Sequence, residues 1–204
     1  MADYKDIVGT AVRNNAGTLT SAKKGEIFYD STNLDFVFTT PNVTTTGAWR
    51  TGGTMNTARR RLAGAGIQTA ALAISGTADP PLYAQVESYD GSSWTEIADV
   101  NTARARQAAS NYGGVSTTLM FGGSPDNSTV VGNTESWDGS SWSEVSEKNA
   151  NVRECGSAGT STAGIAFGGG LPPNSDSVET WDGSSWTEVA EINTAGRCNG
   201  SKNG

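Results

Sequence analysis

The segment YDGSSWTE, residues 89–96, occurs three times in this chain with nearly the same letters. The second copy, WDGSSWSE, spans residues 137–144, and the third, WDGSSWTE, spans residues 181–188. An Asp-Gly pair between two segments that carry aromatic residues is typical of a tight β-hairpin, because glycine tolerates the positive φ that such a turn needs. The three copies therefore predict one hairpin that is rebuilt at three points of the chain.

The spacing of the copies predicts the architecture. The second tryptophan of each copy is followed seven residues later by an asparagine, and the same spacing joins Trp49 to Asn56. Each full unit reads as four short strands, which in the unit after Asn56 are RRLAGAGI, TAALAISG, AQVESYDG and SSWTEIA. Four strands in about 45 residues are the signature of a β-propeller blade, so the chain is predicted to be all-β. The four anchor tryptophans, which are 45, 48 and 44 residues apart, are Trp49, Trp94, Trp142 and Trp186.

Composition excludes several classes of protein. The chain has 204 residues, enough for one domain with a sizeable core or for two small ones. Its net charge of −7 disfavours nucleic-acid binding, which needs a basic stripe. The one basic run, residues 59–61, is interpreted as a strand edge or an ion-pair site. The longest apolar run, residues 70–74, is far too short to enter a membrane, and the N-terminus lacks the apolar stretch of a secretion signal.

Enzymatic chemistry is not expected. The chain has no histidine, which removes the commonest general base and the commonest metal ligand together. No nucleophile elbow, phosphate-binding loop or dinucleotide fingerprint occurs. We therefore expect no catalytic residue, no metal and no cofactor. The two cysteines, Cys155 and Cys198, are expected to be buried thiols, although a single bridge between them stays open.

Residues 89–104, YDGSSWTEIADVNTAR, followed by TTLMFGG at 117–123, resemble a kelch repeat. Such repeats combine an aromatic-Asp pair, a tryptophan, an arginine after a loop, and an apolar strand that ends in Gly-Gly. Arg104 matches the arginine, whereas Arg153 and Arg197 stand one place later, and the histidine that often follows is absent. The resemblance implies a kelch-like β-propeller built from four-stranded blades. The matching strand ends are Phe121-Gly122-Gly123 and Phe167-Gly168-Gly169.

Longer stretches resemble the kelch-like virion proteins of marine tailed phages such as cyanophages. These stretches include GEIFYDSTN at 25–33, GAGIQTAALA at 64–73 and GSSWTEVA at 183–190, and the resemblance covers nearly the whole chain. It implies a non-enzymatic structural protein of the tail, fibre or baseplate, assembled in the host cytoplasm with other virion proteins and as a homo-oligomer. It also implies loops that contact a host-surface glycan or a protein. Decoration of the capsid or neck, and a cellular kelch-type interaction module, stay open as alternatives.

The chain is expected to contain an arm and a propeller. Residues 1–25 are polar and lack a core pattern, so we predict an extended arm that docks on a neighbour in the virion. Residues 26–204 are predicted to form the propeller, with three full repeats and a partial unit at each end. The partial units either combine into a fourth blade or belong to a longer propeller. Residues 25–38 also work as an independent hairpin that turns at residues 30–33.

Two sets of repeated residues have a structural and a functional interpretation. The aromatic pairs either pack between blades or stack on sugar rings, and strict repetition favours packing. A glutamate two residues before each pair either forms an ion pair with the repeated arginine or is one of two catalytic carboxylates; the ion pair is favoured. A second repeated glutamate, at 96, 144 and 188, is expected to face solvent. The residues concerned are Tyr89/Trp94, Trp137/Trp142 and Trp181/Trp186, with Glu87, Glu135 and Glu179.

The loops that differ between units are the better candidates for a ligand surface, because loops vary while a scaffold repeats. They are TADPPLYAQ at 77–85, SPDNSTVVGN at 124–133 and GLPPNSDS at 170–177. Each follows the apolar strand of its unit, so we expect all three on one face. Their polar residues are candidates to bind a glycan or a cation, or are solvated turn residues: Asp79, Asp126, Asn127, Asn174 and Asp176.

Overall fold

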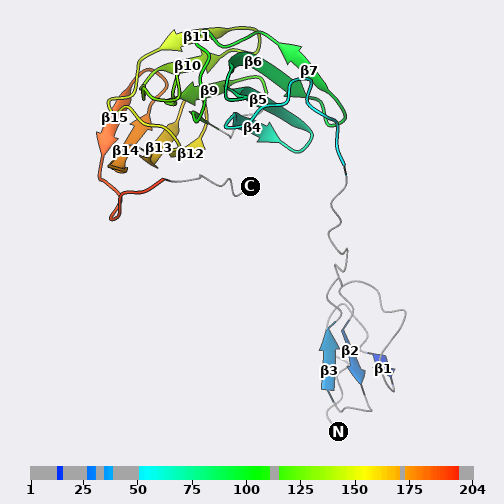
Figure 1. The fold of residues 1–204 in the computed structure, drawn as a ribbon. Helices are drawn as coiled ribbons and strands as arrows, with labels where there is room; N and C mark the ends of the chain where they lie inside the picture. The colour runs from blue at the N-terminus through cyan, green and yellow to red at the C-terminus, as the bar shows by residue number, and fades with distance from the viewer. Residues whose placement is uncertain are drawn as a thin grey trace. The chain divides into compact units, whose positions relative to one another are not determined.

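The computed structural model describes residues 51–110, 115–170 and 173–197 in full, and the backbone of three short strands before them. The chain divides into two compact units, Met1–Thr51 and Gly52–Gly204, which are described separately (Figure 1). Every regular element in the described residues is a β-strand, so the all-β class predicted from the repeat is confirmed. No helix in these residues is long and apolar enough to cross a membrane.

The first unit contains a three-stranded sheet of order β1-β2-β3, formed by β1 (Arg13–Asn15), β2 (Ile27–Asp30) and β3 (Asp35–Phe38). Strands β2 and β3 are antiparallel with Ile27 opposite Phe38, which confirms the hairpin expected there. Strand β1 pairs in parallel with β2, so part of the segment predicted to be an arm belongs to this sheet. The docking role of residues 1–25 stays a prediction, and the turn at 31–34, Trp49 and the strand expected around it lie outside the described residues.

The second unit contains three antiparallel sheets of four strands, each in the order of the sequence. The first sheet consists of β4 (Ala63–Ile67), β5 (Ala70–Thr77), β6 (Leu82–Tyr89) and β7 (Trp94–Ile97). The second consists of β8 (Ala108–Ala109), β9 (Thr118–Phe121), β10 (Thr134–Trp137) and β11 (Trp142–Val145). The third consists of β12 (Gly156–Gly159), β13 (Gly164–Gly169), β14 (Ser175–Trp181) and β15 (Trp186–Val189). The four strands predicted for each unit are therefore present (Figure 1).

The quoted segment forms the hairpin between the third and fourth strands of each sheet. In the second sheet Trp137 lies opposite Trp142, and the turn between them contains Gly139 with a φ of 99°. The carboxylate of Asp138 accepts hydrogen bonds from the backbone N–H groups of Ser140 and Ser141, each at 2.8 Å. An aspartate that holds its own turn in this way explains why the Asp-Gly-Ser-Ser order repeats.

Two hydrophobic clusters join the three sheets. The second sheet contributes Trp137 and Trp142 to one cluster, where they lie with Leu72, Ile74 and Val86 of the first sheet. The third sheet repeats this arrangement against the second. Strand β9 belongs to both clusters, because Met120 lies in the first cluster while Leu119 and Phe121 lie in the second. A strand buried on both faces accounts for the continuous apolar run at residues 119–121. The second cluster contains Trp181 and Trp186 with Leu119 and Phe121.

The Gly-Gly pair at the end of the second strand lets the segment that leads to the next sheet approach the backbone of this strand closely. Gly122 has a φ of 68°, and a Cβ atom there would lie 2.5 Å from the carbonyl oxygen of Val152. The N–H of Gly123 donates to that carbonyl at 2.8 Å. The same bond recurs from Gly76 to Arg104 at 2.9 Å in the first sheet. In the second sheet the glycines therefore leave room for this backbone contact, whereas in the first sheet Ser75 occupies the position of Gly122 and its hydroxyl donates to the carbonyl of Arg104 at 2.7 Å.

The first strands of the sheets lie beside one another, since β8 contacts both β4 and β12. Backbone bonds continue this row: Arg106 N–H donates to Arg61 C=O and Glu154 N–H donates to Arg106 C=O, both at 2.8 Å. Both a β-sandwich and a propeller-like fold contain successive sheets of this kind. The described residues do not include the closure of a ring.

Candidate functional site at the loop end of the sheets

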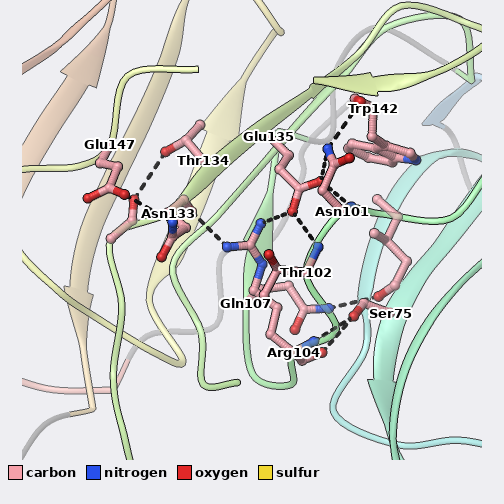
Figure 2. A network of polar contacts seen from close by, with 12 residues as sticks. Ser75, Asn101, Thr102, Arg104, Gln107, Asn133, Thr134, Glu135, Trp142 and Glu147 are labelled. Carbon is pink, nitrogen blue, oxygen red and sulfur yellow. Dashed lines mark hydrogen bonds and ion pairs between the residues drawn. The ribbon is translucent and has the colours of Figure 1, made fainter. Parts of the chain in front are cut away.

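The repeated glutamates hold the segments that connect the sheets, and Figure 2 shows the network around one of them, Glu135. Glu135 on β10 is fully buried, and its Oε1 accepts a hydrogen bond from Arg104 Nη2 at 2.5 Å. Its Oε2 accepts from the backbone N–H of Asn101 at 2.7 Å and from the amide of the same residue at 3.0 Å. Asn101 also donates to the carbonyl of Trp142 at 3.1 Å. The asparagine of one unit is thereby bonded to the repeated glutamate and to the anchor tryptophan of the next unit, 41 residues further along the chain.

The first sheet uses the same arrangement. Glu87 accepts hydrogen bonds from Arg59 Nη1 at 2.6 Å and from the backbone N–H of Asn56 at 2.7 Å. Burial alone would raise the pKa of Glu87, but these bonds and that of Thr57 outweigh it, so the pKa lies below its ordinary value. The predicted ion pair between the repeated glutamate and an arginine is confirmed in the first two sheets.

The third sheet corrects the prediction. Glu179 is bound by Lys148 Nζ at 2.5 Å and by the backbone N–H groups of Asn149 and Ala150. Burial opposes the charge of Glu179, yet the hydrogen bond from Lys148 and those from the backbone lower its pKa. Arg153 instead donates to the backbone carbonyl of Asn127 at 3.2 Å. Lys148 directly precedes Asn149, the repeat asparagine, and its ammonium group binds Glu179 in place of an arginine.

The three repeated carboxylates are enclosed by protein. All three side chains are fully buried, and each accepts several hydrogen bonds from the connecting segment that covers it. The second repeated glutamate, at 96, 144 and 188, is exposed as expected. Across the described ranges, no three His, Cys, Asp or Glu side chains are grouped to hold a metal ion. Cys155 is buried within the second cluster, and Cys198 lies outside the described residues.

The aromatic pairs face the neighbouring sheet. The ring centroids of Trp137 and Trp142 are 5.4 Å apart, as are those of Trp181 and Trp186, and all four rings are buried. Tyr89 and Trp94, with centroids 4.9 Å apart, are only half-buried. Trp94 lines an open groove of about 730 Å³ on the first sheet. Packing between sheets therefore occupies the two later pairs, whereas Trp94 of the first pair borders the groove.

The variable loops hold most of their polar residues in local contacts. Asp126 accepts hydrogen bonds from the backbone N–H groups of Ser128 and Thr129, and the contacts of Thr129 are the largest cause that lowers the pKa of Asp126. Asn127 has a φ of 66° and offers its carbonyl to Arg153. These two positions therefore serve turn geometry.

The other three candidate ligand residues, Asp79, Asn174 and Asp176, make separate contacts. Asp79 forms ion pairs with Arg60 and Arg61, the latter at 2.9 Å, so guanidinium groups stand where a bound cation would have to be. Asn174 is exposed, and the backbone carbonyl of Asp176 accepts a hydrogen bond from Ile192 at 3.0 Å. The five candidates do not converge on a single cation site.

An arginine cluster beside these loops was not predicted. Residues 59–61 were predicted to be a strand edge or an ion-pair site, and all three form ion pairs. Arg60 and Arg61 contact Asp79, while Glu154 contacts Arg106 at 3.4 Å and Arg197 at 3.2 Å. The sequence contains a signal for the cluster, because an arginine recurs four or five residues after each repeat asparagine. The arginine cluster is defined as Arg60, Arg61, Arg106, Arg153 and Arg197.

Comparison with protein-family models found no match for the chain, and a search of curated proteins found no similar protein.

Proposed function

We propose that the chain is a non-enzymatic structural protein of a tailed-phage virion, located in the tail, fibre or baseplate. In this proposal the second unit is a kelch-like β-propeller, or a section of one, that presents its loop end to a host surface or to a protein. Residues 1–25 contribute to docking on a neighbouring virion protein, and several copies assemble in the particle.

One observation carries the proposal: the glutamates that repeat on the third strands are used within the scaffold, and the residues that vary lie in loops. Glu87, Glu135 and Glu179 are enclosed by the connecting segments, so these repeated carboxylates have a structural role. A scaffold of this kind supports binding through its loops rather than catalysis.

The propeller form is supported by the equivalence of the sheets. Each sheet has the same strand order, the same hairpin and the same buried carboxylate, and the aromatic pair of one sheet packs on the sheet before it. Units that stack in one direction with an equal contact each time are typical of propellers and other repeat folds. The resemblance of the repeat sequence to marine phage proteins favours a virion protein over a cellular interaction module.

The location is tested on purified particles of the phage that carries the gene. An antibody raised against the recombinant chain is applied with gold label in electron microscopy, and the particles are also examined by mass spectrometry. The major capsid protein serves as the positive control and a phage replication protein as the negative control. Label on the tail or baseplate is expected. Absence of the protein from particles, with its presence in infected cells, would overturn the proposal.

A further inference from the structure

We propose that the arginine cluster binds an acidic polysaccharide through its carboxylate or sulfate groups. The choice of a polysaccharide rests on the proposed contact with a host surface, whereas the site for oxyanions rests on the geometry of the cluster alone.

The cluster is built by the repeat itself. Arg61, Arg106 and Glu154 occupy equivalent positions of the three units, and all three have a positive φ, of 57°, 65° and 54°. The backbone bonds from Arg106 to Arg61 and from Glu154 to Arg106 fix this row across three sheets. The side chains of Arg61, Arg106 and Glu154 therefore project from backbone segments that are hydrogen-bonded to one another.

The cluster has more positive than negative charge. Its five arginines stand against the three carboxylates of Asp79, Glu154 and the nearby Asp126, which leaves a charge of +2 (five minus three) on a chain whose net charge is −7. Asp126 stays charged because hydrogen bonds from Thr129 and Ser128 lower its pKa.

The pKa of Arg106 is affected by the neighbouring positive charges. Burial is the first cause that lowers the pKa of Arg106, and the charges of Arg61 and Arg153 lower it further. An oxyanion placed among these groups would relieve their mutual repulsion.

The arginines of the cluster that reach solvent come from successive units. The side chains of Arg60 and Arg197 are each 61% exposed, those of Arg61 and Arg106 are 34% and 16% exposed, and they come from the first to the third unit. A guanidinium group matches a carboxylate or sulfate group with two parallel hydrogen bonds. A ligand with a charge on successive residues suits such a row better than a single small ion.

Nucleic acid and acidic protein are the competing ligands. Proteins that bind single-stranded nucleic acid stack bases on aromatic rings, and no member of the cluster is aromatic. Acidic protein is separated from polysaccharide by the choice of probes.

Binding is measured by titration of the full chain with dextran sulfate and with polygalacturonate, and neutral dextran is the control. Both acidic polymers are expected to bind, with an affinity that falls as salt increases. The triple substitution Arg60→Gln, Arg61→Gln and Arg197→Gln should weaken binding by about tenfold or more, which is about 1.4 kcal/mol. Arg13→Gln, which removes one charge from the other unit, should leave it unchanged.

A second variant moves binding in the opposite direction. Asp79→Asn removes the internal partner of Arg60 and Arg61, so acidic polymers should bind about threefold more tightly or better. Asp99→Asn, which removes the same charge at an exposed position, is the matched control and should have a smaller effect. This comparison keeps the test decisive even where the triple variant does not fold.

Three results would overturn the inference. They are equal binding by the triple variant and the unaltered chain, no binding of either acidic polymer, and tighter binding of poly-glutamate or single-stranded DNA than of the polysaccharides. None of these results bears on whether the protein is found in the virion. Conversely, absence from the virion would leave a measured oxyanion site in place.

Discussion

Arg104 and Glu135 form a fully buried ion pair, 2.5 Å from Nη2 to Oε1, between residues 31 positions apart in the chain. Arg104 lies in the segment that connects the first and second sheets, and Glu135 lies on the third strand of the second sheet. Two charges taken out of water are stabilising only when the remaining donors and acceptors are also satisfied. Here the backbone N–H of Asn101 donates to Glu135 and the carbonyl of Asn133 accepts from Arg104, so the pair fixes the entry of the chain into the second sheet. Arg104 Nε is buried without a hydrogen-bond partner among the described residues.

The first prediction concerns this pair. Glu135→Ala should lower the free energy of unfolding by about 3–5 kcal/mol, because it leaves the Arg104 charge buried without a partner. Urea unfolding followed by tryptophan fluorescence measures the change. Glu144 lies directly opposite on β11 and is exposed, so Glu144→Ala should change stability by about 0.5 kcal/mol or less. Similar losses for both variants would contradict the assignment.

The second prediction separates Lys148 from Arg153. Lys148 is buried, with its Nζ 2.5 Å from Glu179 and 5.0 Å from the centre of the Trp186 ring. Lys148→Met should therefore cost about 3–5 kcal/mol. Arg153→Gln removes a hydrogen bond to a backbone carbonyl and should cost about 1.5 kcal/mol or less. Urea unfolding of both variants measures this order, and the reverse order would restore Arg153 as the partner of Glu179.

The third prediction compares two equivalent tryptophans. Trp142 is buried between the first and second sheets, so Trp142→Ala should cost about 3–5 kcal/mol. Trp94 is half-buried beside the open groove, so Trp94→Ala should cost at least about 1 kcal/mol less, because less apolar area leaves water there. Thermal and urea unfolding supply both values. Equal losses would show that the groove side of Trp94 is covered in solution.

The fourth prediction concerns acid. The backbone N–H of Ser141 is the largest cause that lowers the pKa of Asp138, and Ser185 has the same effect on Asp182; each pKa falls from 3.8 to about 2. A lowered folded-state pKa contributes stability above the unfolded value, and this stability is lost as pH falls from about 4 through about 2.

The melting temperature should therefore decrease across this range. The double substitution Asp138→Asn and Asp182→Asn should reduce the decrease, because an amide does not titrate and its oxygen still accepts the turn bonds. Asp99→Asn is the control. An equal decrease in the double variant and the unaltered chain would refute the role of the two turns.

Much of the scaffold was predictable because local chemistry specifies it. The Asp-Gly turn, the apolar second strand and the Gly-Gly end each act within a few residues, and the three hairpins appear where the letters repeat. The ion pair of the repeated glutamate was also predictable, since both partners recur once per unit.

The partner in the third sheet was not predictable from the pattern. Arg153 stands one place later than Arg104 relative to its asparagine, and a shift of one residue turns a side chain in another direction. Lys148 binds Glu179 only because the segment that connects the second and third sheets places it over this carboxylate. The arginine cluster was missed for a similar reason, as its members are far apart in sequence and meet only where the first strands gather.

The sequence by itself determined the class of fold, the number of complete units and the residues of each hairpin, because turn chemistry and the alternation of strands are local. The tertiary structure alone decided which charges pair, which aromatic rings are buried, and which arginines meet at the loop end. Those outcomes depend on how one sheet packs on the next, and the free energy of burying a charge or a ring depends on the neighbours that packing provides.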